Sequence, residues 1–203
     1  MTIQTKLHQA LEKQRAGELS EAAEAYKEIL RIDSAHPDAL HLLGLIESSR
    51  GNYQQAVSLI QQAVKITPTS PVLHGNLGVV LRHAGKIEAA IASYRRSIEL
   101  DPSNSDAHFN LGKSLKIAGQ DEEAELFFRK AISLSPNKAS PWLSLVAIYS
   151  GKDLDKAMII GEQSVQYCPN NADVQMNLGS LYRRSGQVEK AIACFRKSVA
   201  LAP

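Results

Sequence analysis

The sequence repeats itself with a period of 34 residues, and this period constrains the fold more than any other feature. The clearest column is a glycine that recurs at Gly17, Gly51, Gly85, Gly119 and Gly186. Columns of alanine, proline and Leu-Gly keep the same spacing, and all share one single-residue deletion between Trp142 and Ala157. Because independent columns stay in one register, each period corresponds to one structural repeat.

Each repeat predicts two short amphipathic helices. In the third repeat, the first helix carries apolar or small residues at i, i+3, i+4 and i+7, which form one helical face: His74, Leu77, Gly78 and Leu81. Gly85 then supplies a left-handed turn that ends this helix, and Asp101–Pro102 stops the second one. One hairpin cannot bury both of its faces, so stacked hairpins are expected to form a solenoid.

A 34-residue unit with Leu-Gly, an alanine, an aromatic residue and Asp-Pro or its equivalent resembles the tetratricopeptide repeat, and the resemblance covers essentially the whole chain. It implies an all-α fold, a right-handed superhelix of about six helix–turn–helix units in a single array over residues 1–203. The expected repeats are 3–36, 37–70, 71–104, 105–138, 139–171 and 172–203. The resemblance also implies that the first helices line a concave face, which binds an extended or helical peptide of another protein.

The resemblance assigns the second, fifth, sixth, ninth, twelfth and thirteenth residues of each repeat to the concave groove. The candidate peptide-binding residues are Asn76, Asn110, Asn177, Arg82, Lys113, Lys116, Arg183, Phe109 and Met176. The asparagine amides offer donors and an acceptor that suit a peptide backbone. The basic residues would favour a partner with acidic residues along one edge, and the apolar residues would receive partner side chains.

A structural interpretation competes with each of these assignments. Asn-Leu-Gly is common in such repeats, so the asparagine column has as much a structural as a functional explanation. Acids at helix starts and bases at helix ends offset the helix macrodipole, and this account of the charges is the stronger one. Packing between neighbouring repeats competes for some of the apolar residues.

Two repeats depart from the pattern. The first helix of the first repeat is polar where later repeats are apolar, which suits a terminal cap: its residues are Lys6, Gln9, Ala10 and Lys13. The fifth repeat is one residue short in its turn, and it has Val146 in place of the usual glycine and Gly161 in place of the usual aromatic residue. We expect Val146 to fill the space vacated at Gly161, with Trp142 covering the gap.

Composition and motifs favour a binding protein over an enzyme. The chain is 44% hydrophobic, 22% charged and has a net charge of +2, which gives no reason to expect nucleic acid or a membrane as partner. No segment reads as a signal peptide or a membrane span, so a cytoplasmic location is expected. The two cysteines predict free thiols, and the histidines lack the spacing of metal ligands. No catalytic motif and no cofactor motif occurs.

The sequence therefore predicts a non-enzymatic adaptor that binds a protein or peptide partner. Two alternatives stay open. The segment that begins at His36 looks like the repeat regions of bacterial O-linked N-acetylglucosamine-transferase-like proteins, so the chain could be the N-terminal substrate-docking region of a glycosyltransferase or sulfotransferase. No solvating helix follows the last hairpin, which leaves Phe195 and Val199 facing water: this favours the docking region of a longer protein, and the other alternative is a homo-oligomer formed through this end.

Overall fold

A computed structural model of the chain describes residues 2–202, which form twelve α-helices and no strand. The helices are α1 (Ile3–Arg15), α2 (Leu19–Ile32), α3 (Pro37–Ser49), α4 (Tyr53–Ile66), α5 (Pro71–His83), α6 (Ile87–Leu100), α7 (Ser105–Ile117), α8 (Asp121–Leu134), α9 (Ala139–Tyr149), α10 (Leu154–Tyr167), α11 (Ala172–Arg184) and α12 (Val188–Leu201). Every odd-numbered helix begins at the first residue of an expected repeat. The all-α fold of six helical hairpins is confirmed.

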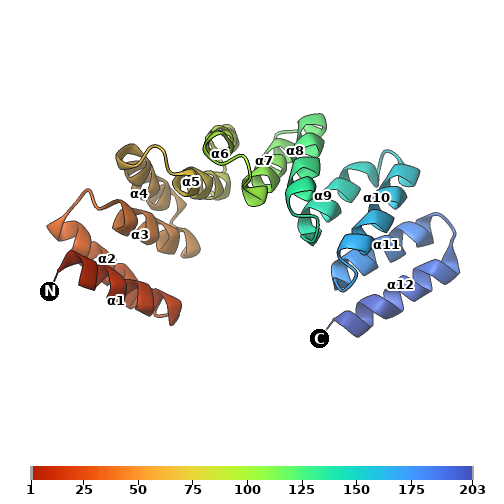
Figure 1. Cartoon of the computed structure of the whole chain (residues 1–203), viewed down its shortest axis with the longest axis horizontal. Helices are drawn as coiled ribbons and strands as arrows, with labels where there is room; N and C mark the ends of the chain where they lie inside the picture. Colours follow the sequence, from red (N-terminus) through yellow and green to blue (C-terminus); the bar gives the residue numbers. More distant parts are fainter. Residues whose placement is uncertain (1, 203) are drawn as a thin grey trace. The chain divides into compact units, whose positions relative to one another are not determined.

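The hairpins are divided between two compact halves, Met1–Pro102 and Ser103–Pro203, each with three repeats (Figure 1). Within each half the second helix of a hairpin packs on the first helix of the next, as α2 does on α3 and α8 on α9. This is the stacking expected of a helical solenoid. A single array over residues 1–203 stays a prediction, and its end residues Met1 and Pro203 lie outside the described part of the chain.

The turn inside a regular hairpin follows from its glycine. Gly85 has a φ of +75°, a conformation that a residue with a Cβ adopts only with strain. Its N–H donates to the carbonyl of Arg82, and the next N–H, of Lys86, donates to the carbonyl of Leu81 at 2.9 Å. These two bonds satisfy carbonyls that the end of α5 would otherwise leave open. The other four glycines of this column also have positive φ, so the predicted turn is confirmed.

Close contact within a hairpin depends on the glycine of the Leu-Gly pair. A Cβ on Gly112 in α7 would lie 2.7 Å from Cε1 of Phe128 in α8, and a Cβ on Gly179 in α11 would lie equally close to Cε1 of Phe195 in α12. The aromatic ring of the second helix therefore lies directly against the backbone of the first. This contact accounts for the pairing of small and large residues across the hairpin.

A hydrogen bond joins several repeats to the loop before them. The fourth residue of the repeat donates an N–H to a proline carbonyl in that loop: His74 to Pro68 (2.9 Å), Trp142 to Pro136 (2.8 Å) and Gln175 to Pro169 (3.1 Å). Three different side chains make the same bond, because each offers one N–H at the right distance. This position therefore fixes neighbouring repeats to each other within each half.

The irregular fifth repeat turns differently. α9 has only 11 residues, and Gly151 does not adopt a positive φ. Instead, Asp153 is the N-cap residue before α10, and its carboxylate accepts the N–H of Lys156 at 3.0 Å. The second helices of the other five hairpins have no such side-chain cap. A side-chain cap thus replaces the glycine turn where the deletion has shortened the loop.

The expected exchange between Val146 and Gly161, with Trp142 over the gap, stays a prediction. A Cβ on Gly161 would meet only Cδ1 of Leu181 and Cδ1 of Leu178 within 4 Å, at 3.0 and 3.2 Å. The leucines of the next repeat therefore occupy the space directly beside this glycine. The ring of Trp142 stacks on Tyr167 with centroids 5.5 Å apart. The missing aromatic residue is replaced from α11, because α11 can approach a bare backbone closely.

Both cysteines are free thiols, as predicted, and burial raises the pKa of Cys168 and of Cys194. None of the helices between residues 2 and 202 combines the length and the hydrophobicity that a membrane crossing requires.

Candidate functional site

The predicted binding residues all lie on first helices of hairpins, and we call the side of the first helices that carries them, taken within each half, the A-helix surface of that half. Within each half, first helices of successive repeats touch, since α3 contacts α5 and α9 contacts α11. The N-terminal half carries Asn76 and Arg82, both on α5. The C-terminal half carries Phe109, Asn110, Lys113 and Lys116 on α7, and Met176, Asn177 and Arg183 on α11.

Asn76 already has a partner on the neighbouring repeat. Its amide nitrogen lies 2.8 Å from Nε2 of His41 in α3. Burial lowers the pKa of His41, and Asp38 opposes this shift only in part, so the imidazole is neutral at neutral pH. A neutral ring with its proton on Nδ1 accepts the amide N–H at Nε2. The pair links α3 to α5 and leaves the other N–H and the carbonyl of Asn76 for a ligand.

Arg82 is directed partly into its own repeat. Burial raises the pKa of Tyr94, and the guanidinium of Arg82 beside the hydroxyl offsets part of that increase. In the first repeat Gln14 stands at the position of Arg82, and its Oε1 accepts the hydroxyl of Tyr26 at 2.7 Å. In the first repeat the twelfth residue is therefore the hydrogen-bond partner of the buried tyrosine, whereas the hydroxyl of Tyr94 in the third repeat has no hydrogen bond to a described residue. The sequence analysis missed this use, although the two tyrosines share one column.

On α7 an aromatic residue and a cation combine. The ring of Phe109 packs against Phe128 with centroids 5.8 Å apart, and Nζ of Lys113 lies 5.5 Å from the centre of the Phe109 ring. The spacing i, i+4 places Phe109 and Lys113 on one helical face. Phe109 is half-buried in this arrangement. It thus packs against the second helix of its own hairpin and also forms part of the surface, whereas the structural interpretation had expected packing between neighbouring repeats.

Three kinds of side chain lie along α11. Met176 is 51% exposed, Asn177 is half-buried, and Arg183 is exposed in the last turn of the helix. The spacing i, i+7 places Met176 and Arg183 on one side of the helix, and Asn177 follows Met176 about 100° around the axis. Oδ1 of Asn177 is buried and accepts no hydrogen bond from the described residues.

The charges of these helices also follow the helix dipole. Asp106 and Asp173 lie in the first turns of α7 and α11, whereas Lys116 and Arg183 lie in their last turns. Asp106 forms an ion pair with Lys138 at 2.6 Å. Offsetting the dipole contributes about 0.3–1 kcal/mol per charge at an exposed site, so stability alone can account for these positions.

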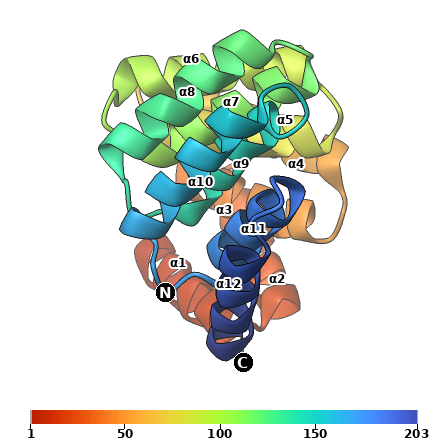
Figure 2. The same ribbon diagram turned by 90° about the vertical axis from the view of Figure 1, so that its right-hand side faces the viewer.

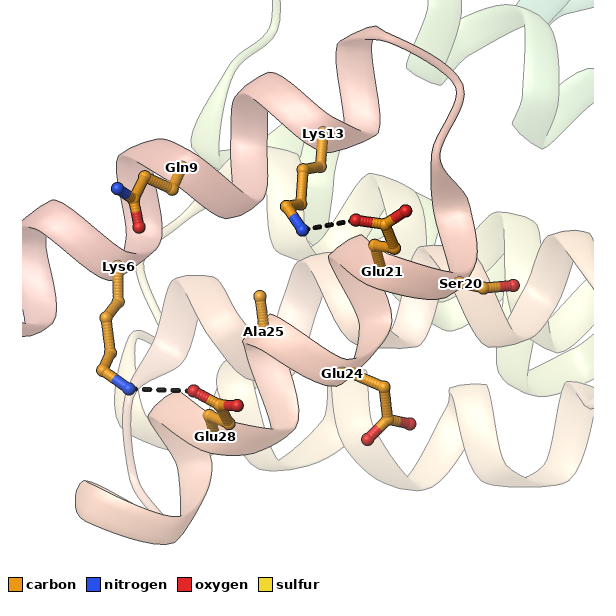
Figure 3. A pocket seen from close by; sticks show the side chains of 8 residues that line it. All are labelled: Lys6, Gln9, Lys13, Ser20, Glu21, Glu24, Ala25 and Glu28. Carbon is orange, nitrogen blue, oxygen red and sulfur yellow. Dashed lines mark hydrogen bonds and ion pairs between the residues drawn. The ribbon is translucent and has the colours of Figure 1, made fainter.

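A charged hollow of about 610 Å³ lies between α1 and α2 (Figure 3). Its lining residues are Lys6, Gln9, Lys13, Ser20, Glu21, Glu24, Ala25 and Glu28. Nζ of Lys6 lies 2.8 Å from Glu28, and Nζ of Lys13 lies 2.5 Å from Glu21. The sequence predicted a polar first helix but not these partners, which come from the second helix. Because the charges are already paired, the hollow is a solvated face rather than a site with a free charge.

Among residues 2–202, no three side chains of histidine, cysteine, aspartate or glutamate come together as a metal site would require. The predicted absence of a cofactor stays a prediction.

Family models match most of the chain. A model described as tetratricopeptide repeat matches residues 7–71, a second with the same description matches residues 105–138 and 172–203, and one described as TPR repeat matches residues 80–116. The chain is a tetratricopeptide repeat protein. The matched ranges leave out residues 139–171, the repeat with the deletion.

Solved structures of tetratricopeptide repeat proteins are similar to this one. A MamA protein is 25% identical, with 81% of this chain and 91% of that chain covered and a TM-score of 0.74. A protein described as pilF of Pseudomonas aeruginosa is 18% identical, with 95% and 88% covered and a TM-score of 0.80. YrrB, described as a TPR protein with an unusual peptide-binding site, is 19% identical, with 89% and 94% covered and a TM-score of 0.65.

Among curated proteins, no sequence matches this tetratricopeptide repeat protein. The resemblance to repeat regions of O-linked N-acetylglucosamine-transferase-like proteins therefore stays a prediction, as does a role as the docking region of a larger enzyme.

Proposed function

We propose that this tetratricopeptide repeat protein is an adaptor whose A-helix surface binds a peptide segment of a partner protein. The observation that carries the proposal is the composition of α11, which exposes Met176 and the cation of Arg183 on one side and carries the half-buried amide of Asn177 next to Met176 in sequence. An apolar contact, a backbone-binding amide and a charge are what an extended peptide requires.

The surface on α7 supports the same function. Lys113 and Lys116 add positive charge, and Phe109 adds apolar area next to them. A partner segment with acidic residues and at least one apolar anchor would satisfy these groups. In this proposal the chain contributes binding only.

The test is to screen immobilised peptide libraries and to measure the affinity of the best peptide by fluorescence polarisation. Met176→Ala and Arg183→Ala should each weaken binding, and Asn110→Ala with Asn177→Ala should weaken it about tenfold, because a lost backbone hydrogen bond costs about 0.5–1.5 kcal/mol. Asn76→Ala should have a smaller effect, since its amide is already engaged with His41.

A matched control comes from the second helices. Ile159 on α10 is 56% exposed, close to the value of Met176, but it does not lie on the A-helix surface. Ile159→Ala should leave the affinity unchanged. Equal losses for Ile159→Ala and Met176→Ala, or unchanged affinity in all the A-helix variants, would show that the peptide binds elsewhere.

A further inference from the structure

α12 is the outermost helix of the C-terminal half (Figures 1 and 2), and it carries a stripe of apolar residues. Val188, Ile192 and Val199 are 53%, 44% and 75% exposed, and Phe195 lies between them, half-buried. Their spacing of 4, 3 and 4 residues is that of the apolar seam of a helix pair. A shallow hollow of about 350 Å³ opens on this stripe.

Equivalent positions in other repeats show what such a face is built for. Phe128 of α8 and Ile60 of α4 stand where Phe195 stands in α12, and both are fully buried. α8 is covered by α9, and α4 by α5. Phe195 makes the same contact with the glycine of its own hairpin but keeps part of its ring exposed. The outer face of α12 thus has the composition of a face that another helix covers.

Charges beside the stripe indicate which helix fits. Glu189 and Arg196 each follow a stripe residue by one position, and both are exposed. If two copies of α12 pair in antiparallel orientation, Val188 lies opposite Val199 of the other copy and Ile192 lies opposite its Phe195. Glu189 then lies near Arg196 of the other copy, and symmetry makes this contact twice. A parallel pair would instead align equal charges at the same level.

We propose that this protein forms a two-fold dimer in which α12 pairs antiparallel with α12 of a second copy. The apolar stripe forms the centre of the contact, and the Glu189–Arg196 pairs set its direction. Because only one helix of each copy takes part, the interface is small and the dimer is weak and concentration-dependent. The A-helix surface of each copy is not required for this contact, so a dimer would present two peptide-binding surfaces.

Sedimentation velocity over a concentration series reaching about 1 mM tests the proposal, because weak dimers dissociate below millimolar concentration. The wild type should shift from monomer to dimer, and Ile192→Glu should remain monomeric. Glu189→Arg and Arg196→Glu should each weaken the dimer about tenfold, since two attractive contacts become repulsive. The double variant Glu189→Arg/Arg196→Glu should regain dimerisation.

Glu88 provides the control, because it occupies in α6 the repeat position that Glu189 occupies in α12 and is also exposed. Glu88→Arg should dimerise like the wild type, and far-UV circular dichroism should show unchanged helicity in every variant. A wild type that stays monomeric throughout, or oligomers that keep growing with concentration, would overturn the dimer. Failure of the double variant to recover would overturn the antiparallel pairing.

Discussion

The outer faces of the first and the last repeat differ in chemical character, because the first is charged and the last is apolar. On the first repeat, Lys6 and Lys13 of α1 form ion pairs with Glu28 and Glu21 of α2. On the last repeat, α12 presents apolar side chains, among them Val199 with 75% of its surface exposed. The charged side chains of the first face are paired within their own hairpin and remain in contact with water. The last face exposes apolar side chains, whose contact with water is unfavourable.

The difference arises from few positions. Lys6 and Lys13 stand where the third repeat has His74 and Leu81, the face that meets the preceding hairpin. The contacts inside the hairpin are unaffected, since Ala10 and Tyr26 stay fully buried. A repeat can therefore keep its internal packing while its outer face changes from interface to solvated surface. Packing within a hairpin and packing between hairpins are set by separate groups of residues.

The largest effect on stability is expected from truncating two equivalent aromatic residues, Phe128, which is fully buried, and Phe195, which is partly exposed. Phe128→Ala should lower the free energy of unfolding by about 3–5 kcal/mol, the range for a fully buried phenylalanine. Phe195→Ala should cost about half as much, because part of its ring already meets water. Urea unfolding followed by circular dichroism measures both at a concentration where the protein is monomeric. Equal losses would show that the last hairpin is packed as tightly as an inner one.

A smaller difference is expected when the glycine beneath each ring gains a methyl group. Gly112→Ala should destabilise the protein by about 1–3 kcal/mol, because the new Cβ meets Phe128, which has no room to move. Gly179→Ala meets Phe195 at the same distance, but that ring can shift toward solvent. The gain of about 1 kcal/mol in helix propensity then brings the net change near zero. Thermal unfolding compares the two variants, and a cost at Gly179 that matches Gly112 would show a rigid last hairpin.

The smallest effect is expected at the opposite end of the chain. Lys6→Ala combined with Lys13→Ala removes both ion pairs between α1 and α2, yet the freed glutamates stay solvated. Exposed ion pairs contribute little to stability, so the melting temperature should hardly change. Raising the salt concentration should have equally little effect on the wild type. A clear loss of stability in the double variant would mean that these pairs hold α1 against α2.

The regular parts of this fold could be predicted from the sequence because period and composition determine them. All six repeats begin where the columns placed them, and the glycine turns follow from the need for positive φ. The fifth repeat could not be predicted, because its missing ring at Gly161 is replaced by Leu178 and Leu181 from the next repeat. Comparing the repeats position by position shows which residue is unusual, but it does not show which side chains of a neighbouring repeat pack beside that residue.

The candidate site was predictable only as positions on helices. That Asn76, Phe109 and Met176 lie on first helices follows from their places in the repeat. The partners of these residues depend on side-chain rotamers and on distant residues, as with Asn76 and His41, 35 positions apart. Helical periodicity specifies a face but not the hydrogen bonds across it.

The hydrogen bond from the fourth residue of a repeat to the preceding proline carbonyl has a consequence for how such a chain can change. An imidazole, an indole and an amide make this bond at His74, Trp142 and Gln175. The connection between the two repeats therefore requires only one side-chain N–H at a fixed position. The acceptor is a main-chain oxygen, which no substitution removes. A hairpin gained by duplication would keep this bond wherever its fourth residue carries a side-chain N–H, as in these three repeats, but not after a repeat such as the second, which has Leu40 at this position.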